Sequence, residues 1–229
     1  MKVLAIQPKL VEQVHDAIVS EISSGKLKPG ERIVQEQIAQ LLGVSRQPVQ
    51  QALLLLRKQG VLRDAPGRGL IVASLDSDQV SSMYDIRAVL EGLAFRKAAE
   101  HNAERARKQG PALIQNGRKA AAGSSVAAMI AADLKFHDFI YRLSENPLIA
   151  PLMEAQWTST QRVMGEVLMR DELPRDIWNQ HEALLDAVMA GDGAAAEALA
   201  RQHITLAATV MINRLRSEAA ATAENVAAA

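Results

Sequence analysis

The stretch DLKFH places two polar side chains, Asp133 and His137, four residues apart in a segment whose other inward positions are expected to be apolar. If the segment is helical, both lie on one face together with Ile130 and Ile140. The apolar neighbours predict that this face points into a core, where a carboxylate and an imidazole are costly to bury without a partner. We therefore expect something in that core that binds both side chains.

Two further histidines repeat this pattern. His181 and His203 each lie on an apolar helical stripe, the first between Ile177 and Leu184. A single histidine in such a place is more often a core residue bonded to a backbone carbonyl than a ligand. Three of them, with an aspartate one turn from the first, favour a metal site assembled between facing helices. A purely structural polar cluster is the alternative.

The absence of cysteine restricts any metal ligands to His, Asp and Glu and excludes disulfides and thiolate nucleophiles. Three imidazoles and one carboxylate suit several first-row ions, and zinc, nickel and manganese all fit. The expected cofactor is thus a divalent metal ion of one of these kinds. Its predicted ligands are Asp133, His137, His181 and His203.

The elements that must position these residues are helices. Aromatic residues make up only 3% of the 229, and apolar spacing between polar breaks predicts an antiparallel bundle after a polar linker at 74–77. We expect helices at 78–99, 103–121, 124–144, 147–169, 174–190 and 193–217, with a break near Gly110-Pro111 and a frayed tail at 218–229.

The first 73 residues have a different pattern. Apolar residues at helical spacing predict a helix that ends near Gly25, and a short helix follows with Leu41 and Leu42 expected to face inward. The next helix, in VSRQPVQQALLLLRKQG, should begin at Ser45 as N-cap and bury every third or fourth residue. Two helices joined by a short turn, the second exposing Arg and Gln, have the layout of a helix-turn-helix.

The segment VLRDAPGRGLIVAS predicts a β-hairpin behind this helix, with Arg68 at its tip, where it could enter a minor groove or meet a phosphate. Residues 1–73 carry 10 basic and 6 acidic side chains, and residues 74–229 carry 16 and 20, so the basic end and the acidic end suggest different partners. The alternative is that an amphipathic helical hairpin with Arg and Gln outside is only a solvated surface.

Three motifs, LKPGERI, AQLLGVSRQPVQQAL and RGLIV, resemble in order and spacing the winged helix-turn-helix of GntR-family bacterial regulators over residues 7–73. The family commonly has Arg where Gln50 stands, so base preference is expected to differ at that step. The resemblance implies a fold that is mostly α: three helices plus a β-hairpin, then the bundle. It also implies DNA contacts by Arg32, Ser45, Arg46, Gln47, Gln50, Arg68 and Gly69.

The later motifs DLKFHDFIYRLSENPLI and QHEALLDAVMAGDGAAAEALARQHI resemble the all-helical FCD effector domain of the FadR branch of that family, over about residues 78–215. Members that keep one Asp and three His bind a divalent metal, which implies the same four ligands. Arg87 matches an Arg near the family's cavity and would bind a carboxylate bidentately. A surface pair with Glu91 is its alternative role, and Arg162 and Trp178 are further candidates for the effector pocket.

These patterns predict a transcriptional regulator, most simply a repressor, that responds to binding of a small carboxylate. A homodimer should bind a near-palindromic operator. No signal peptide or membrane span is expected at the N-terminus or elsewhere, so a cytoplasmic protein is predicted. The protein is not expected to be an enzyme. Two alternatives stay open: a metal-dependent enzyme using the His/Asp site, and a DNA-binding regulator whose bundle only dimerises.

Overall fold

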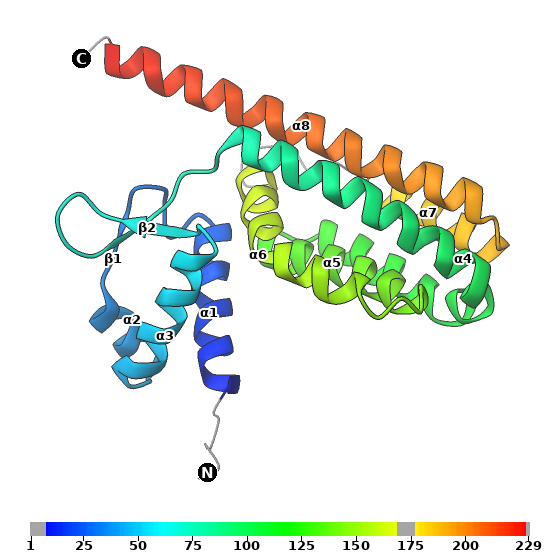
Figure 1. The fold of residues 1–229 in the computed structure, drawn as a ribbon, viewed down its shortest axis with the longest axis horizontal. Coiled ribbons are helices and arrows are strands. Elements are labelled where there is room, and N and C mark those ends of the chain that lie inside the picture. Colours follow the sequence, from blue (N-terminus) through cyan, green and yellow to red (C-terminus); the bar gives the residue numbers. More distant parts are fainter. Residues whose placement is uncertain (1–7, 169–176, 228–229) are drawn as a thin grey trace. The chain divides into compact units, whose positions relative to one another are not determined.

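The computed structural model describes residues 8–168 and 177–227 and divides into two compact units, residues 1–74 and 75–229 (Figure 1). Each unit has its own apolar core. The predicted fold class, mostly α with a small sheet near the N-terminus, is confirmed.

The first unit contains three helices and three short strands. The helices are α1 (Pro8–Ser23), α2 (Gln35–Leu42) and α3 (Arg46–Lys58). The strands are β1 (Arg32–Ile33), β2 (Leu62–Asp64) and β3 (Leu70–Val72), which form an antiparallel sheet of order β1-β3-β2. The predicted hairpin is β2 and β3. Strand β1 was not predicted, because its two residues give too short a pattern to be detected.

Helix α3 buries its apolar stripe as its spacing predicts, with Val49, Ala52 and Leu56 fully enclosed. The expectation that Leu41 and Leu42 face inward is wrong, since they are 84% and 39% exposed. Ala39 is the buried residue of α2, and a helix turns about 100° per residue, so Leu41 falls on the opposite side.

The second unit is a bundle built from α4 (Ser77–Ala121), α5 (Val126–Leu143), α6 (Ile149–Leu168), α7 (Ile177–Ala190) and α8 (Gly193–Ala227). Helix α4 packs against α5, α7 and α8, and Figure 1 shows α4 and α8 side by side. Aromatic and aliphatic side chains, among them Phe95, Phe136 and Ile140, fill the space between the helices.

Helix α4 combines the two helices expected at 78–99 and 103–121, because they meet at a kink instead of a loop. Only Asn102 has non-helical backbone angles (φ −136°, ψ 29°), and its side-chain amide donates to the Leu143 carbonyl at 2.8 Å. The break expected at Gly110-Pro111 is wrong. Pro111 lies on the exposed face, where water can satisfy the carbonyl that loses its helical donor.

Helix α8 continues to Ala227, beyond the expected end at 217, so residues 218–227 of the expected tail are helical. The sequence there is rich in alanine, which has the highest intrinsic helix propensity. The expected start of the helix at 174–190 falls partly outside the described residues, which resume at Ile177.

Candidate functional site

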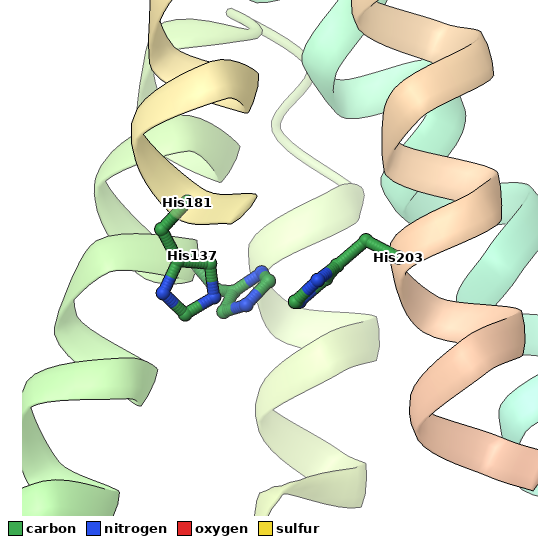
Figure 2. A group of neighbouring side chains, drawn as sticks. All are labelled: His137, His181 and His203. Atoms are coloured by element: carbon green, nitrogen blue, oxygen red, sulfur yellow. The ribbon is translucent and has the colours of Figure 1, made fainter. Parts of the chain in front are cut away.

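Three histidines from three helices meet inside the second unit (Figure 2). His137 belongs to α5, His181 to α7 and His203 to α8, and each ring offers one nitrogen within 4.8 Å of the nitrogens of the other two. All three side chains are buried. The bundle thus brings together imidazoles that are far apart in the sequence.

Asp133, one turn before His137 on α5, is buried beside these rings. Its Oδ1 lies 3.4 Å from His181 Nε2, and its Oδ2 lies 3.9 Å from His137 Nε2. Burial raises the pKa of the Asp133 carboxyl, while the charges of His137 and Arg87 oppose that rise. The four residues proposed from the sequence as ligands therefore lie in one cluster.

The burial, hydrogen bonding and pKa of His181 test whether a metal ion fits this cluster. Its ring is fully buried, and among the described residues neither Nδ1 nor Nε2 makes a hydrogen bond, although Asp133 Oδ1 lies 3.4 Å from Nε2. Burial, and then the nearby His203 and His137, hold the pKa of His181 well below its usual range, so the ring is neutral. A buried nitrogen without a partner is costly, and a neutral imidazole is a good ligand for a divalent ion. Three nitrogen donors and one carboxylate fit such an ion.

Glu91 on α4 is a member of the site that the sequence analysis did not select. The side chain is fully buried, and its Oε2 lies 2.6 Å from His137 Nδ1. Its Oε1 accepts from Arg87 Nε at 3.0 Å and from Arg87 Nη2 at 2.8 Å. Burial alone would raise the pKa of the Glu91 carboxyl, but His137 and Arg87 hold it below its usual range. Small and apolar neighbours, Gly92, Ala94 and Phe95, were the available signal that this position is buried.

Gln180 on α7 was also missed. Its Oε1 lies 2.9 Å from His203 Nδ1. An amide oxygen can only accept, so this contact favours a proton on Nδ1 and leaves Nε2 of His203 for a ligand. The Glu91 carboxylate favours the same tautomer of His137. Two of the three rings are therefore oriented by a neighbouring acceptor.

A cavity of about 170 Å³ adjoins the cluster, and Asp133, His137 and His203 form part of its wall. Arg87 and Trp178 also line it, whereas Arg162 is not among the described lining residues. Arg87 is paired with Glu91, but the pair is buried and does not lie on the surface. Its guanidinium also lies over the Tyr84 ring, 4.7 Å from the centroid.

Arg162 is buried on α6, away from this wall. Burial lowers the pKa of its guanidinium to about 10, although the charge of Glu166 acts in the opposite direction. The effector contact of Arg162 stays a prediction from the sequence.

In the first unit, the residues predicted to contact DNA form an exposed face. Arg46, Gln47 and Gln50 project from the first turns of α3 and are exposed. Ser45 occupies the N-cap position, but its side chain makes no capping hydrogen bond. Arg46 Nη2 donates to Glu36 Oε1 on α2 at 2.5 Å. Polar side chains thus extend from the N-terminal end of α3, where a helix also favours anions.

The hairpin turn carries the other candidates. Arg32 Nη2 donates to the Arg68 carbonyl at 2.5 Å, which ties β1 to the turn. Gly67 and Gly69 have φ values of 98° and 95°, a region that residues with a Cβ rarely adopt. The Arg68 side chain between them is exposed, so the turn presents a cation to solvent.

Comparison with known proteins identifies both units. Residues 10–72 match the bacterial regulatory proteins of the gntR family, and residues 82–206 match the FCD domain. The chain belongs to the GntR family of regulators and carries an FCD domain. This confirms the resemblance described from the sequence motifs.

The relatives of this GntR regulator are consistent with that family assignment. The "Probable D-xylose utilization operon transcriptional repressor" of Paenarthrobacter nicotinovorans is 30% identical over 199 residues, which are 85% of each chain. The HTH-type regulator YdhC of Bacillus subtilis is 32% identical over 146 residues, 62% of this chain and 64% of that protein. The solved structure of Escherichia coli McbR/YncC has the same fold, with a TM-score of 0.78 at 23% identity, covering 90% of this chain and 98% of that one.

This GntR regulator is therefore a DNA-binding transcriptional regulator, and its relatives are regulators and not enzymes. The alternative of a metal-dependent enzyme is set aside on that ground. Within residues 8–168 and 177–227, no helix combines the length and the apolar character that crossing a bilayer requires.

Proposed function

We propose that this GntR regulator is a repressor whose helical unit binds a divalent metal ion and, beside it, a small carboxylate that changes its affinity for operator DNA. One observation carries the proposal: His181 is buried next to Asp133, His137 and His203 without a hydrogen bond at either ring nitrogen among the described residues, and Asp133 Oδ1 faces Nε2 at 3.4 Å. A cluster kept only for structure would be expected to satisfy those nitrogens.

Asp133, His137, His181 and His203 would hold the ion, which can be zinc, nickel or manganese. When bound, the ion supplies a positive, Lewis-acidic point for a ligand oxygen. Arg87 would bind the effector carboxylate. Glu91 engages its Nε and Nη2. Trp178 would form part of the pocket wall.

In the first unit, Arg46, Gln47 and Gln50 would read base edges in the major groove. Arg32, Ser45, Arg68 and Gly69 would contact the sugar-phosphate backbone or the minor groove. A homodimer would place two such units on a near-palindromic operator. The exposure of these side chains supports this assignment.

A single-residue variant tests the proposed sensing role. The operator is a duplex selected from a random pool by the full chain. His181→Ala should lose the metal, still bind this duplex, and no longer respond to a carboxylate that releases the unmodified protein. Metal analysis, gel shift and a melting curve measure these effects, because losing an ion can also weaken the fold. His101→Ala, a change of an exposed histidine on α4, is the matched control. A folded His181→Ala protein with a normal effector response would overturn the proposal.

A further inference from the structure

The wall of the cavity has a polar end and an apolar remainder. Among the described lining residues, the polar end consists of Tyr84, Arg87, Asp133, His137, Gln180 and His203. Most of these groups already have partners inside the protein. The Tyr84 hydroxyl donates to Met211 Sδ at 2.8 Å, and Gln180 contacts His203. Apart from Arg87, which would hold one carboxylate, the described groups that keep hydrogen-bonding capacity at this end are the Gln180 amide nitrogen and the Tyr84 oxygen.

The remainder of the wall comes from five helices and is built mainly from hydrocarbon and thioether groups. Met129 belongs to α5, Met164 to α6, Trp178 to α7 and Met211 to α8. Methionine side chains adapt to irregular apolar shapes. A hydroxyl pressed against the methionine and aliphatic part of this wall would lose its hydrogen bonds to water and gain none.

The size of the cavity limits the ligand further. At about 170 Å³ it is smaller than the sites that enclose drug-sized molecules, which begin near roughly 300 Å³. An apolar cavity of about 150 Å³ in another protein holds benzene. A hydrocarbon body of about four to six carbons is thus the size that fits.

We infer that the effector is a monocarboxylic acid with a short hydrocarbon body that carries no hydroxyl remote from its carboxylate, and not a sugar acid. The inference rests on the proposed function, since it takes the carboxylate to be held at Arg87 beside the ion. To the proposed function the inference adds the class of acids that the site accepts. Discrimination comes from the wall of Met129, Met164, Trp178 and Met211, because this wall faces the part of the acid that is remote from the carboxylate.

Two acids of equal size test the inference on the metal-loaded full chain. Pentanoate and 4-hydroxybutanoate have the same number of heavy atoms and differ by a terminal methyl in place of a hydroxyl. Calorimetry should give pentanoate the lower Kd by about tenfold or more, since a buried hydroxyl without a partner is penalised. Melting curves should shift upward further with pentanoate at equal concentration.

A variant assigns this preference to the wall. Met164→Gln keeps the side-chain length and adds an amide, so the preference for pentanoate should shrink or reverse. Leu152→Gln, on the same helix at a 52% exposed position outside the wall, should leave it unchanged. If Met164→Gln does not fold, as its unliganded melting curve would reveal, Met129→Gln on α5 replaces it.

The outcomes separate the two proposals. Equal or tighter binding of 4-hydroxybutanoate would overturn the inferred class of acid and leave carboxylate sensing intact. If neither acid binds the metal-loaded protein, carboxylate sensing fails, and the inference fails with it. An unchanged preference in a folded Met164→Gln and in Met129→Gln would show that the wall does not select the acid.

Discussion

Glu91 has two carboxylate oxygens, and each one faces a donor. Oε1 accepts from Arg87, and Oε2 lies 2.6 Å from His137 Nδ1. An amide at this position has one acceptor and one donor, so it can serve only one of these neighbours. Glu91→Gln should therefore lower the affinity for the metal by about 10–100-fold, as expected when the partner that orients a ligating histidine is lost.

Competition with a chromogenic chelator would measure this change. Glu197→Gln is the control, because Glu197 pairs with Arg96 and Arg201 and is not among the residues that line the cavity. Melting curves of both variants would separate a loss of metal affinity from a loss of folding. An equal effect in the two variants would count against a specific role of Glu91.

Arg46 tests the DNA-binding face at the same scale. Arg46→Ala should weaken binding to the operator more than binding to random duplex, because a bidentate base contact contributes about 1–3 kcal/mol of discrimination. Gel shifts on both duplexes at one salt concentration measure the ratio. Equal loss on all sequences would make Arg46 a phosphate contact.

Gln50→Arg should change base preference at one step of each half-site.

At the scale of elements, the packing of α4 on α7 depends on a glycine. A Cβ built at Gly117 would lie 2.0 Å from Trp178 Cη2, so the indole must move if the residue changes. Gly117→Ala should lower the free energy of unfolding by about 1–3 kcal/mol through overpacking. The substitution should also weaken metal binding, because the centroids of the Trp178 and His181 rings lie 4.7 Å apart.

Gly123→Ala, in the turn after α4, is the control. Its Cβ would lie 3.3 Å from the Ala120 carbonyl oxygen, a far milder contact. Chemical denaturation of both variants measures the difference. A Gly117→Ala protein as stable as the control would show that α4 and α7 have room to separate.

Apolar spacing predicted most of the helices, because each one buries a stripe that recurs with the period of the helix. The same stripes identified His137, His181 and His203 as inward-facing. Spacing could not identify the kink at Asn102, which depends on the distant Leu143 carbonyl. It also could not identify Glu91 or Gln180, since a polar residue becomes part of a site through neighbours that only the folded bundle supplies. Pro111 was misread because its solvent-exposed position was unknown.

At the scale of the whole molecule, we expect a dimer. One winged helix gives a small DNA footprint, and two are needed for a near-palindromic operator. The helical unit also leaves large apolar side chains exposed, including Ile86 and Val89 on α4. Light scattering should return about twice the chain mass of 24.8 kDa. A monomer that persists at micromolar concentration and on DNA would refute this.

The position of Trp178 has a practical consequence. The chain has two tryptophans, and Trp178 borders the cavity with its ring 4.7 Å from that of His181. Replacing the other, Trp157→Phe, would leave one tryptophan, next to the proposed ligands. Its emission would then follow ion loading and acid binding in solution without any dye or label, and stopped-flow mixing would give the rates of both steps.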